Sequence, residues 1–206
     1  LCQTFVCHNP ARLPGPATWV NIQRIRVKDS YTNIWWMSPS ERPKADNRRV
    51  LTEYSPGMKR LLKTQTYNSG TRPSGHRIND TSFLKENKGA IPPNGLNVGE
   101  GGPYAVNFLE IANTRSGDDY EQYCKNSGLE VHPARMQATL AEFFIRFLTE
   151  PGDLVFDPFA GSNTTGAEAE KLGRRWIATE AEKDYVIGSV ARFKNPRDPV
   201  TKTNTD

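Results

Sequence analysis

The chain has 206 residues, of which 36% are apolar, and its mean hydropathy is −0.67. A chain of this length predicts one domain, or one domain with a smaller appendage. It contains no apolar run of the roughly 18 residues that a membrane-spanning helix needs, and its first residues, LCQTFVCHNP, do not resemble a secretory leader. The three cysteines, Cys2, Cys7 and Cys124, cannot form a closed set of disulfides and lack metal-ligand spacing. We therefore expect a cytoplasmic protein without a membrane partner.

Charge is unevenly distributed along the chain. Residues 1–90 carry 15 Lys and Arg against 6 Asp and Glu, whereas residues 91–206 carry 12 against 17. On a chain with a pI of about 9.0, the basic first part predicts a polyanionic partner. A solvated basic face would give the same composition.

Two strands are expected in residues 1–37. Leu1–Cys7 and Thr32–Met37 have strand-like composition and are joined by a Pro-rich connection. Since the first of these strands begins at the first residue, we expect the chain to be the later part of a longer one.

An irregular basic region is expected over residues 38–104. It is rich in Pro, Gly, Asn and Ser and shows little helical periodicity, and so long an irregular region is usually either functional or disordered. Its cations and its histidine are side chains of the types that contact phosphates and bases. The candidate nucleic-acid-binding residues are Lys44, Arg48, Arg49, Arg72 and His76.

Regular secondary structure is expected again over residues 105–193. In the segment EVHPARMQATLAEFFIRFLTEPGD, apolar residues recur at helical spacing, which predicts a helix that stops at Pro151-Gly152. The elements expected after it are a strand at Leu154–Phe156, a helix at Thr165–Leu172, a strand at Arg175–Thr179 and a helix at Lys183–Phe193. The polar tail, residues 194–206, is expected to be loose.

The stretch LVFDPFAGSNTTGAEAEKLGRRWIATE places an acid after each of two strands, with a glycine turn and a helix between them. In a doubly wound sheet, ligands lie at the carboxyl ends of the strands. Gly161 would let the backbone approach a ligand closely, and Glu180 is placed to accept hydrogen bonds from a ribose diol. Asp157, directly before the turn, would repel a pyrophosphate. A ligand with positive charge, S-adenosylmethionine, therefore fits better than a dinucleotide.

The motif DPFAGSNTTG resembles the Asp-Pro-Phe-x-Gly-Ser-x-Thr-Thr cofactor motif of the DNA amino-methyltransferases. The longer segment from His132 is similar to that family's combined segment, in which His-Pro-Ala-Arg precedes the glycine loop. HNPARLPGP, KADNRRVL, RPSGH and AIPPN also resemble segments of its site-specific modification methylases, so the likeness spans nearly the whole chain. A cofactor half that follows the target-recognition region is the permuted, beta-class order, found in enzymes that modify cytosine N4 or adenine N6. Asn163 stands where many members carry Gly, and Asn tolerates the left-handed backbone.

The resemblance implies a partial Rossmann-like α/β methyltransferase sheet, S-adenosyl-L-methionine as the cofactor and double-stranded DNA as the partner. It makes residues 1–37 strands of this sheet, 38–104 the target-recognition region and 105–193 the cofactor-binding half. It implies no metal site. The implied cofactor-binding residues are Asp157, Pro158, Phe159, Ala160, Gly161, Ser162, Asn163, Thr164, Thr165 and Glu180, with His132, Pro133, Ala134 and Arg135 over the methionine end.

The family's catalytic turn, Asp/Asn/Ser-Pro-Pro-Tyr/Phe after a strand, is missing from the sequence. This turn grips the amino group of a base that has left the duplex. Ile91-Pro92-Pro93-Asn94 lacks the leading polar residue and the aromatic, and Ser38-Pro39-Ser40-Glu41 lacks the second proline and the aromatic. We therefore expect no catalytic residue in this chain, and activity only with a complementing amino-terminal part in cis or in trans, or with a second copy. Overall resemblance favours cytosine N4 over adenine N6.

Two alternatives remain. The chain could be a remnant that binds DNA or a partner without catalysis, or a nucleotide-dependent enzyme such as a dehydrogenase, against which the missing Gly-x-Gly-x-x-Gly argues. Taken singly, Asp157 could cap a helix, Gly161 could serve a plain turn and Glu180 could be a surface acid.

Overall fold

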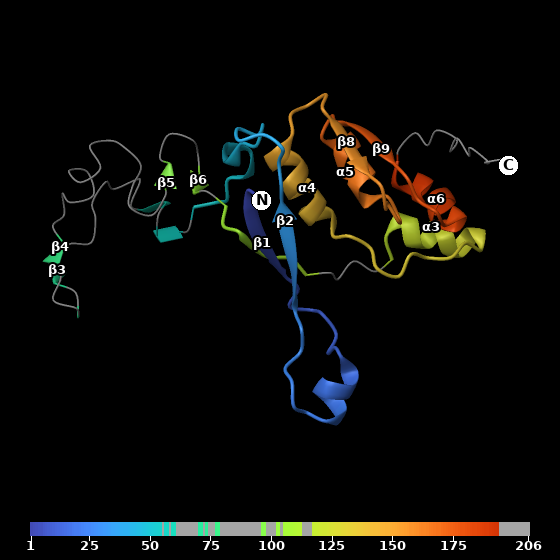
Figure 1. The fold of residues 1–206 in the computed structure, drawn as a ribbon, viewed down its shortest axis with the longest axis horizontal. Helices are drawn as coiled ribbons and strands as arrows, with labels where there is room; N and C mark the ends of the chain where they lie inside the picture. Colours follow the sequence, from blue (N-terminus) through green and yellow to red (C-terminus); the bar gives the residue numbers. More distant parts are fainter. Residues whose placement is uncertain are drawn as a thin grey trace. The chain divides into compact units, whose positions relative to one another are not determined.

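The computed structural model has two compact units, Leu1–Ala45 with Asn107–Asp206, and Asp46–Val106. Figure 1 shows the chain coloured from its first to its last residue. The residues that the structure describes are 1–54, 56–57, 59–60, 70–71, 73, 77–78, 96–97, 102–103, 105–112 and 117–193.

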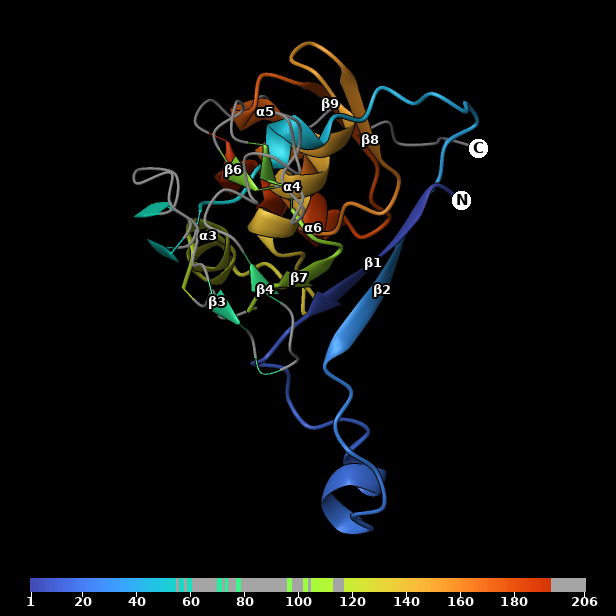
Figure 2. The same ribbon diagram turned by 90° about the vertical axis from the view of Figure 1, so that its left-hand side faces the viewer.

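The first unit contains a three-stranded sheet in the order β2-β1-β7. β1 (Gln3–His8) pairs antiparallel with β2 (Tyr31–Trp36) and parallel with β7 (Phe108–Glu110). Both strands predicted near the start of the chain are thus confirmed. The connection between them, residues 9–30, extends away from the sheet in both ribbon views (Figures 1 and 2) and contains a π-helical turn, η1 (Thr18–Ile22), which the sequence did not predict.

A second sheet in the same unit consists of two parallel strands, β8 (Leu154–Asp157) and β9 (Arg175–Ala178). The helix α5 (Thr164–Lys171) connects them, and α4 (Ala138–Leu148) precedes β8. The predicted order of these elements is confirmed. The ends of β8, α5 and β9 differ by one residue from the prediction, and α4 ends at Leu148, before the predicted stop at Pro151-Gly152. Their shared core is formed by Ala141, Ile145 and Ala169, against which Val155 and Trp176 pack.

The helix α4 contacts both sheets. Its phenylalanines surround Phe5 of β1, and the ring of Phe144 lies 5.1 Å from that of Phe5 in an edge-to-face arrangement. Phe147 also contacts Trp36 of β2 at 5.0 Å. Because Ala141 and Ile145 face α5 and β8 instead, the apolar side chains predicted for this helix divide between two surfaces.

Two further helices complete the first unit. α3 (Asp119–Ser127) starts at Asp118, whose carboxylate accepts the N–H of Glu121, and ends at Gly128 in the left-handed conformation. α6 (Lys183–Ser189) continues into a 3₁₀ turn, η3 (Val190–Arg192), so the helix predicted over 183–193 is shorter than expected. α6 lies close to α3, since a Cβ on Gly188 would be 2.6 Å from Cys124 Sγ.

The second unit contains a 3₁₀ turn and two short ladders. η2 (Asn47–Val50) begins at Asp46. The ladders are β3 (Gly70–Thr71) with β4 (Arg77–Ile78) and β5 (Leu96–Asn97) with β6 (Gly102–Pro103), and each is antiparallel. Arg72, His76, residues 91–94 and the tail, 194–206, lie outside the described residues. None of the helices in the described part of the chain is long and apolar enough to cross a membrane.

Candidate functional site

The two acids singled out in the sequence lie at one edge of the second sheet. Asp157 is the last residue of β8 and pairs with Ala178 of β9, and Glu180 follows two residues later. Since the strands are parallel, their carboxyl ends meet at the same edge. The expected juxtaposition of strand ends, glycine turn and helix start is therefore present.

The turn between β8 and α5 requires left-handed backbone at two positions. Gly161 has φ of 52° and Asn163 has φ of 53°. Asn163 caps α5, because its Oδ1 accepts the N–H of Gly166 at 3.1 Å. Gly166 must be glycine for this cap, since a Cβ there would collide with Asn163 Oδ1. Asn163 thus adopts the left-handed conformation that the sequence analysis allowed for it.

Glu180 is bound to the turn by backbone hydrogen bonds. Its Oε2 accepts the N–H of Gly161 at 2.7 Å, and its Oε1 accepts the N–H groups of Ala181 and Glu182 at 2.9 and 3.0 Å. These bonds, chiefly the one from Glu182, lower the pKa of Glu180 and keep it ionised. Oε1 already accepts two N–H groups, whereas Oε2 accepts one and retains a lone pair for a further donor. A ribose contact through Oε2 remains a prediction.

Asp157 is only partly engaged. Its Oδ1 accepts the N–H of Phe159 at 3.0 Å, and its Oδ2 has no hydrogen-bond partner within the part of the chain that the structure describes. Asp157 lines a cavity of about 830 Å³ together with Ala134, Arg135 and Thr165. A carboxylate oxygen is therefore available at the wall of a cavity large enough for a nucleoside-sized ligand.

His132 covers the glycine turn. A Cβ on Gly161 would be 2.8 Å from His132 Nε2, so the imidazole packs directly on the backbone of the turn. The ring is held by an edge contact with Tyr185 at 4.6 Å and by the N–H of Ala134, which donates to Nδ1 at 3.3 Å. His132 and the glycine turn, separated in the sequence, thus lie together, while the position of His132 over the methionine end of a cofactor remains a prediction.

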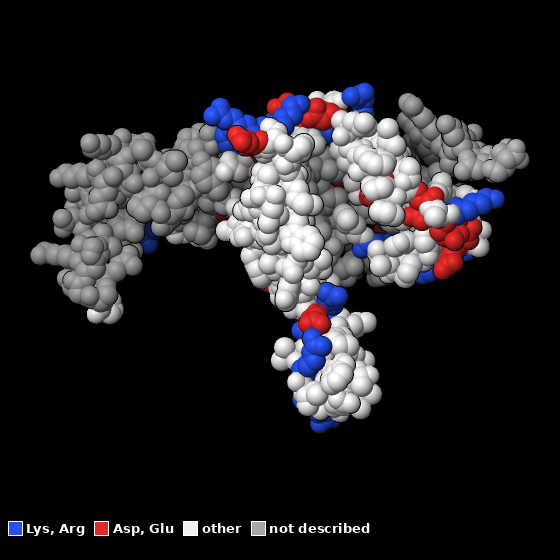
Figure 3. Space-filling view, in the orientation of Figure 1, with Lys and Arg blue, Asp and Glu red and all other residues white. Residues whose placement is uncertain are grey.

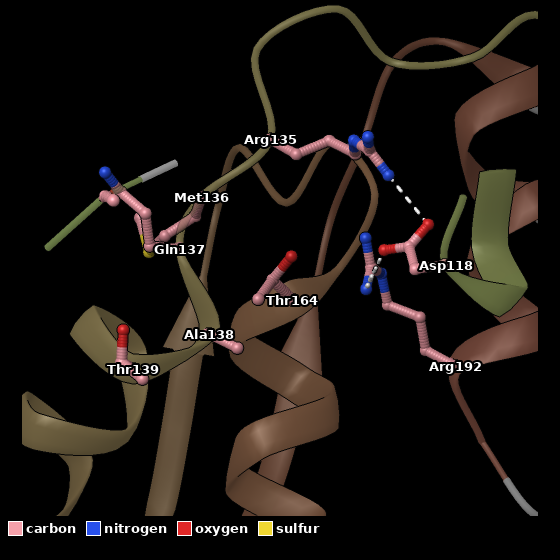
Figure 4. A pocket seen from close by; sticks show the side chains of 9 residues that line it. Asp118, Arg135, Met136, Gln137, Ala138, Thr139, Thr164 and Arg192 are labelled. Carbon is pink, nitrogen blue, oxygen red and sulfur yellow. Dashed lines mark hydrogen bonds and ion pairs between the residues drawn. The ribbon is translucent and has the colours of Figure 1, made fainter. Parts of the chain in front are cut away.

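A charged cluster that the sequence analysis missed lies beneath the turn (Figure 4). Arg192 donates through Nε to the carbonyl of Ser162 at 2.6 Å and through Nη2 to Ser162 Oγ at 3.0 Å. Its Nη1 lies 3.6 Å from Asp118, which also accepts from Arg135 at 2.7 Å. Arg135 reaches Glu121 as well, at 3.2 Å. Arg135 therefore points into this cluster, and Arg192 fixes the position of the turn from behind.

Tyr120 completes the cluster. Its ring lies 4.7 Å from the Arg192 guanidinium, and its hydroxyl accepts the N–H of His132 at 3.1 Å. Burial raises the pKa of Tyr120 to about 12 and lowers that of Arg192. Neither change alters the charge at neutral pH, so Tyr120 stays protonated and Arg192 stays cationic.

The remaining residues of the predicted cofactor motif divide into buried and exposed groups. Ser162 and Thr164 are buried, with 2% and 4% exposure, and their hydroxyls lie 3.4 Å apart. Their side chains therefore support the turn from inside, which leaves the turn backbone as the candidate ligand surface. Phe159 is 89% exposed. The main-chain groups of Pro158 and Ala160 bond to Thr179, and Pro133 is exposed.

The candidate DNA-binding residues fall in different surroundings. Lys44 Nζ lies 2.8 Å from Asp153 and 3.3 Å from Glu150, within the first unit. In the second unit Arg48 forms an ion pair with Asp46 at 2.7 Å, and Arg49 lies in the same 3₁₀ turn. The connection of residues 9–30 also carries cations, visible in blue on Figure 3; they are Arg12, Arg24, Arg26 and Lys28.

The sequence defines the class of this protein. A profile of the N6/N4 DNA methylases matches residues 3–190, and the chain belongs to this family. Type II methyltransferase M.PvuII of Proteus hauseri is 47% identical over 195 residues, which cover 94% of this chain and 54% of that protein. Type II methyltransferase M2.DpnII of Streptococcus pneumoniae is 47% identical over 55 residues, which cover 27% and 20%.

A solved structure is also similar. PvuII DNA methyltransferase, described as cytosine-N4-specific, matches with a TM-score of 0.66 and 36% identity over 95% of this chain and 51% of that one. The α/β methyltransferase fold expected from the sequence is thereby confirmed, and membership of a methylase family agrees with S-adenosyl-L-methionine as the cofactor. The chain spans about half the length of the M.PvuII relative and of the solved PvuII methyltransferase structure.

Proposed function

We propose that this chain is the cofactor-binding and DNA-binding part of a site-specific DNA methyltransferase that modifies an exocyclic base amine. The observation that carries the proposal is the pair of carboxylates, Asp157 and Glu180, at one sheet edge on either side of a glycine turn. Such an edge is where nucleotide-like ligands bind in doubly wound sheets. Asp157 also borders the cavity of about 830 Å³.

The residues at this edge fit S-adenosyl-L-methionine, which supplies a methyl group on a positively charged sulfur. Asp157 Oδ2 is available to bind the ammonium of the methionine part, which would be repelled by an arginine or lysine in its place. Glu180 would accept a ribose hydroxyl with the remaining lone pair of its Oε2. His132 packs on Gly161 and would cover the ligand on the same side.

The order of the parts along the chain supports the permuted, beta class of these enzymes. The basic region precedes the cofactor turn, which lies at residues 157–165. Cytosine N4 is the favoured target over adenine N6, since the PvuII relative is described as cytosine-N4-specific. Double-stranded DNA would contact the basic half of the chain, mainly through phosphates.

The chain would need a complementing part to complete methyl transfer. Methylation of an amine requires acceptors that hold its hydrogens and direct its lone pair toward the methyl group. The 206 residues contain one Pro-Pro pair, Pro92-Pro93, without the flanking residues of the family's catalytic turn. The chain also covers 54% of the M.PvuII relative. An amino-terminal part in cis or in trans is therefore the proposed source of the turn.

One observation favours a second function, that of a non-catalytic remnant that binds DNA or a partner. Both oxygens of Glu180 already accept backbone N–H groups. A carboxylate satisfied in this way could serve only to hold the turn together.

Calorimetric titration of the 206-residue chain with S-adenosyl-L-methionine separates the two functions. We expect saturable binding that Asp157→Ala removes, because the variant lacks the acceptor for the ammonium. Glu142→Ala, which alters an exposed acid on α4, is the control and should bind normally. A silent titration accompanied by DNA binding would instead support the remnant.

A further inference from the structure

Arg192 is a mostly buried cation whose guanidinium group contacts other residues along its whole fork. The side chain is 14% exposed. Nε and Nη2 donate to the carbonyl and the hydroxyl of Ser162, Nη1 faces Asp118, and the group lies over the ring of Tyr120. A planar fork reaches three acceptors at once, which a lysine ammonium cannot do from one position. The site is therefore specific for arginine.

Stability is a weak reason for an ion pair in such a place. Removing two charges from water is costly, and well-packed apolar residues often serve a buried position as well or better. Fixing the register of one segment against another is a better-attested use of such pairs. Here the segment is Ser162, which lies between the two left-handed residues of the turn, Gly161 and Asn163.

The bond to Ser162 holds one peptide group of the turn at both ends. Its carbonyl accepts from Arg192, and its N–H, which belongs to Asn163, donates to the carbonyl of Ala160 at 2.7 Å. Gly161, directly before Ser162, donates its N–H to Glu180 at 2.7 Å. A shift of Ser162 would therefore disturb the bond between the turn and Glu180.

The residues that hold Arg192 also hold the His132 segment. Asp118 caps α3 and Tyr120 lies in the first turn of that helix. The Tyr120 hydroxyl accepts the N–H of His132 at 3.1 Å, and Asp118 accepts from Arg135 at 2.7 Å. The glycine turn and the His132 segment are thus held by the same two residues of α3, to which the sequence analysis assigned no role.

The charged cluster does not itself form a site for a nucleoside-sized ligand. Asp118, Arg135 and Arg192 border a cavity of about 50 Å³ (Figure 4), whereas small-molecule sites begin at roughly 300 Å³. Among the described residues, those that line the cavity of about 830 Å³ do not include Arg192. An effect of Arg192 on a ligand in that cavity therefore acts through Ser162 and the turn.

We propose that Arg192 is a positioning residue of the cofactor site. Held by Asp118 and Tyr120, it keeps Ser162 in place, so that the turn presents Asp157 and Glu180 to one ligand. The inference rests on the proposed function, because it takes that ligand to be S-adenosyl-L-methionine. The segment matched by the family profile ends at residue 190, before Arg192.

Calorimetric titration of the 206-residue chain with S-adenosyl-L-methionine tests the proposal, at a temperature well below the unfolding transition of each variant. Arg192→Lys keeps the charge and loses the fork. It should weaken binding roughly tenfold, the worth of one hydrogen bond to a charged group. Arg146→Lys, at an exposed ion pair with Glu142, is the matched control and should bind normally. Unchanged affinity in Arg192→Lys would overturn the inference and leave the proposed function standing.

Chemical rescue separates positioning from the mere presence of a charge. Arg192→Ala leaves a space that methylguanidinium fits, so adding this cation should restore much of the lost affinity. Methylammonium has no fork and should not. Asp157→Ala lacks a proposed ligand contact, and neither cation should rescue it. Equal rescue of Arg192→Ala by both cations would overturn the inference.

Amide exchange measured by NMR on a chain with isotope-labelled glycine needs no ligand. The Gly161 amide should exchange roughly tenfold faster in Arg192→Lys, because its bond to Glu180 opens more often. The Gly173 amide, bonded to the Glu170 carbonyl after α5, should keep its rate. Equal acceleration at both glycines would indicate general loosening and would overturn the inference. If the unmodified chain does not bind S-adenosyl-L-methionine, the proposed function is refuted, and the Gly161 rate still decides whether Arg192 positions the turn.

Discussion

Gly161 donates its backbone N–H to Glu180 Oε2 at 2.7 Å, and this bond ties the turn after β8 to the residues that follow β9. The same glycine is covered by His132, which approaches within 2.8 Å of where a Cβ would be. Three segments that are distant in the sequence therefore meet at one residue. The conformation of the turn depends on all three.

Replacing Glu180 with Gln should destabilise the chain in a pH-dependent manner. Its carboxylate accepts three backbone N–H groups, and the pKa of Glu180 is lowered below its usual 4.5. A lowered pKa contributes stability that is present above pH 4.5 and is lost as the pH falls through the folded-state pKa. We expect Glu180→Gln to lose about 1 kcal/mol at pH 7, and the difference from the unmodified chain to shrink at acidic pH.

Urea denaturation at several pH values measures this difference. Glu142→Gln, which alters an exposed i,i+4 ion pair with Arg146, serves as the control and should change stability by only a few tenths of a kcal/mol. If the stability difference between Glu180→Gln and the unmodified chain stayed constant as the pH fell to the point of acid unfolding, the ionised Glu180 carboxylate would not be its source.

Gly161→Ala should lower the stability of the chain more than a Gly→Ala substitution at another left-handed position. An alanine at φ of 52° is strained by about 1–2 kcal/mol, and its Cβ would also press on His132. Gly173 has φ of 73° and nothing within 4 Å of a Cβ, so Gly173→Ala reports the backbone strain alone. We expect Gly161→Ala to lose more stability than Gly173→Ala. Combining Gly161→Ala with His132→Ala should remove this additional loss. Equal losses for the two glycines would show that His132 does not press on the turn.

Much of the fold was predictable because its signals are local. The spacing of apolar residues gave α4, and the apolar runs before Asp157 and Glu180 gave β8 and β9. The sequence analysis allowed for left-handed backbone at Asn163, whereas it predicted Gly161 only as a point of close approach to a ligand, and both residues adopt that conformation. The contacts around Arg192 were not predictable, because it reaches Ser162 across 30 residues and meets Arg135 only through Asp118. The spacing of apolar residues carries no information about which distant cations, such as Arg135 and Arg192, contact the same carboxylate.

Arg192→Met should destabilise the turn strongly. The side chain is 14% exposed and makes two hydrogen bonds to Ser162 besides its ion pair with Asp118. Removing one member of a mostly buried charged cluster costs about 3 kcal/mol. Arg192→Lys keeps the charge but cannot contact all three acceptors, so an intermediate loss is expected. Thermal unfolding measures the stability of each variant. Arg146→Met, which removes an exposed ion pair with Glu142, should lose less than about 1 kcal/mol of stability.

DNA affinity should fall steeply as salt is added. Lys and Arg outnumber acids in residues 1–90. The plot of log K against log salt has a negative slope, and each phosphate contact that is lost reduces the magnitude of this slope by about 0.9. Arg49→Ala should therefore reduce the slope by roughly one unit, measured by fluorescence anisotropy with a labelled duplex. Arg146→Ala is the matched loss of one cation outside the basic part. If the DNA affinity of the unmodified chain did not change with salt concentration, phosphate contacts would not be the source of that affinity.

The pure chain should bind S-adenosyl-L-methionine without methylating DNA. In the proposed function, the site at Asp157 and Glu180 holds the donor, and the turn that grips the amine of the target base belongs to a separate part. A donor alone leaves that nitrogen with its lone pair delocalised into the ring, where it is a poor nucleophile. Tritium transfer from labelled cofactor to duplex DNA should therefore stay at background for the 206-residue chain and rise when a fragment carrying the turn is added. Transfer by the pure chain, undiminished after a further chromatographic step, would falsify the assignment of catalysis to a separate part.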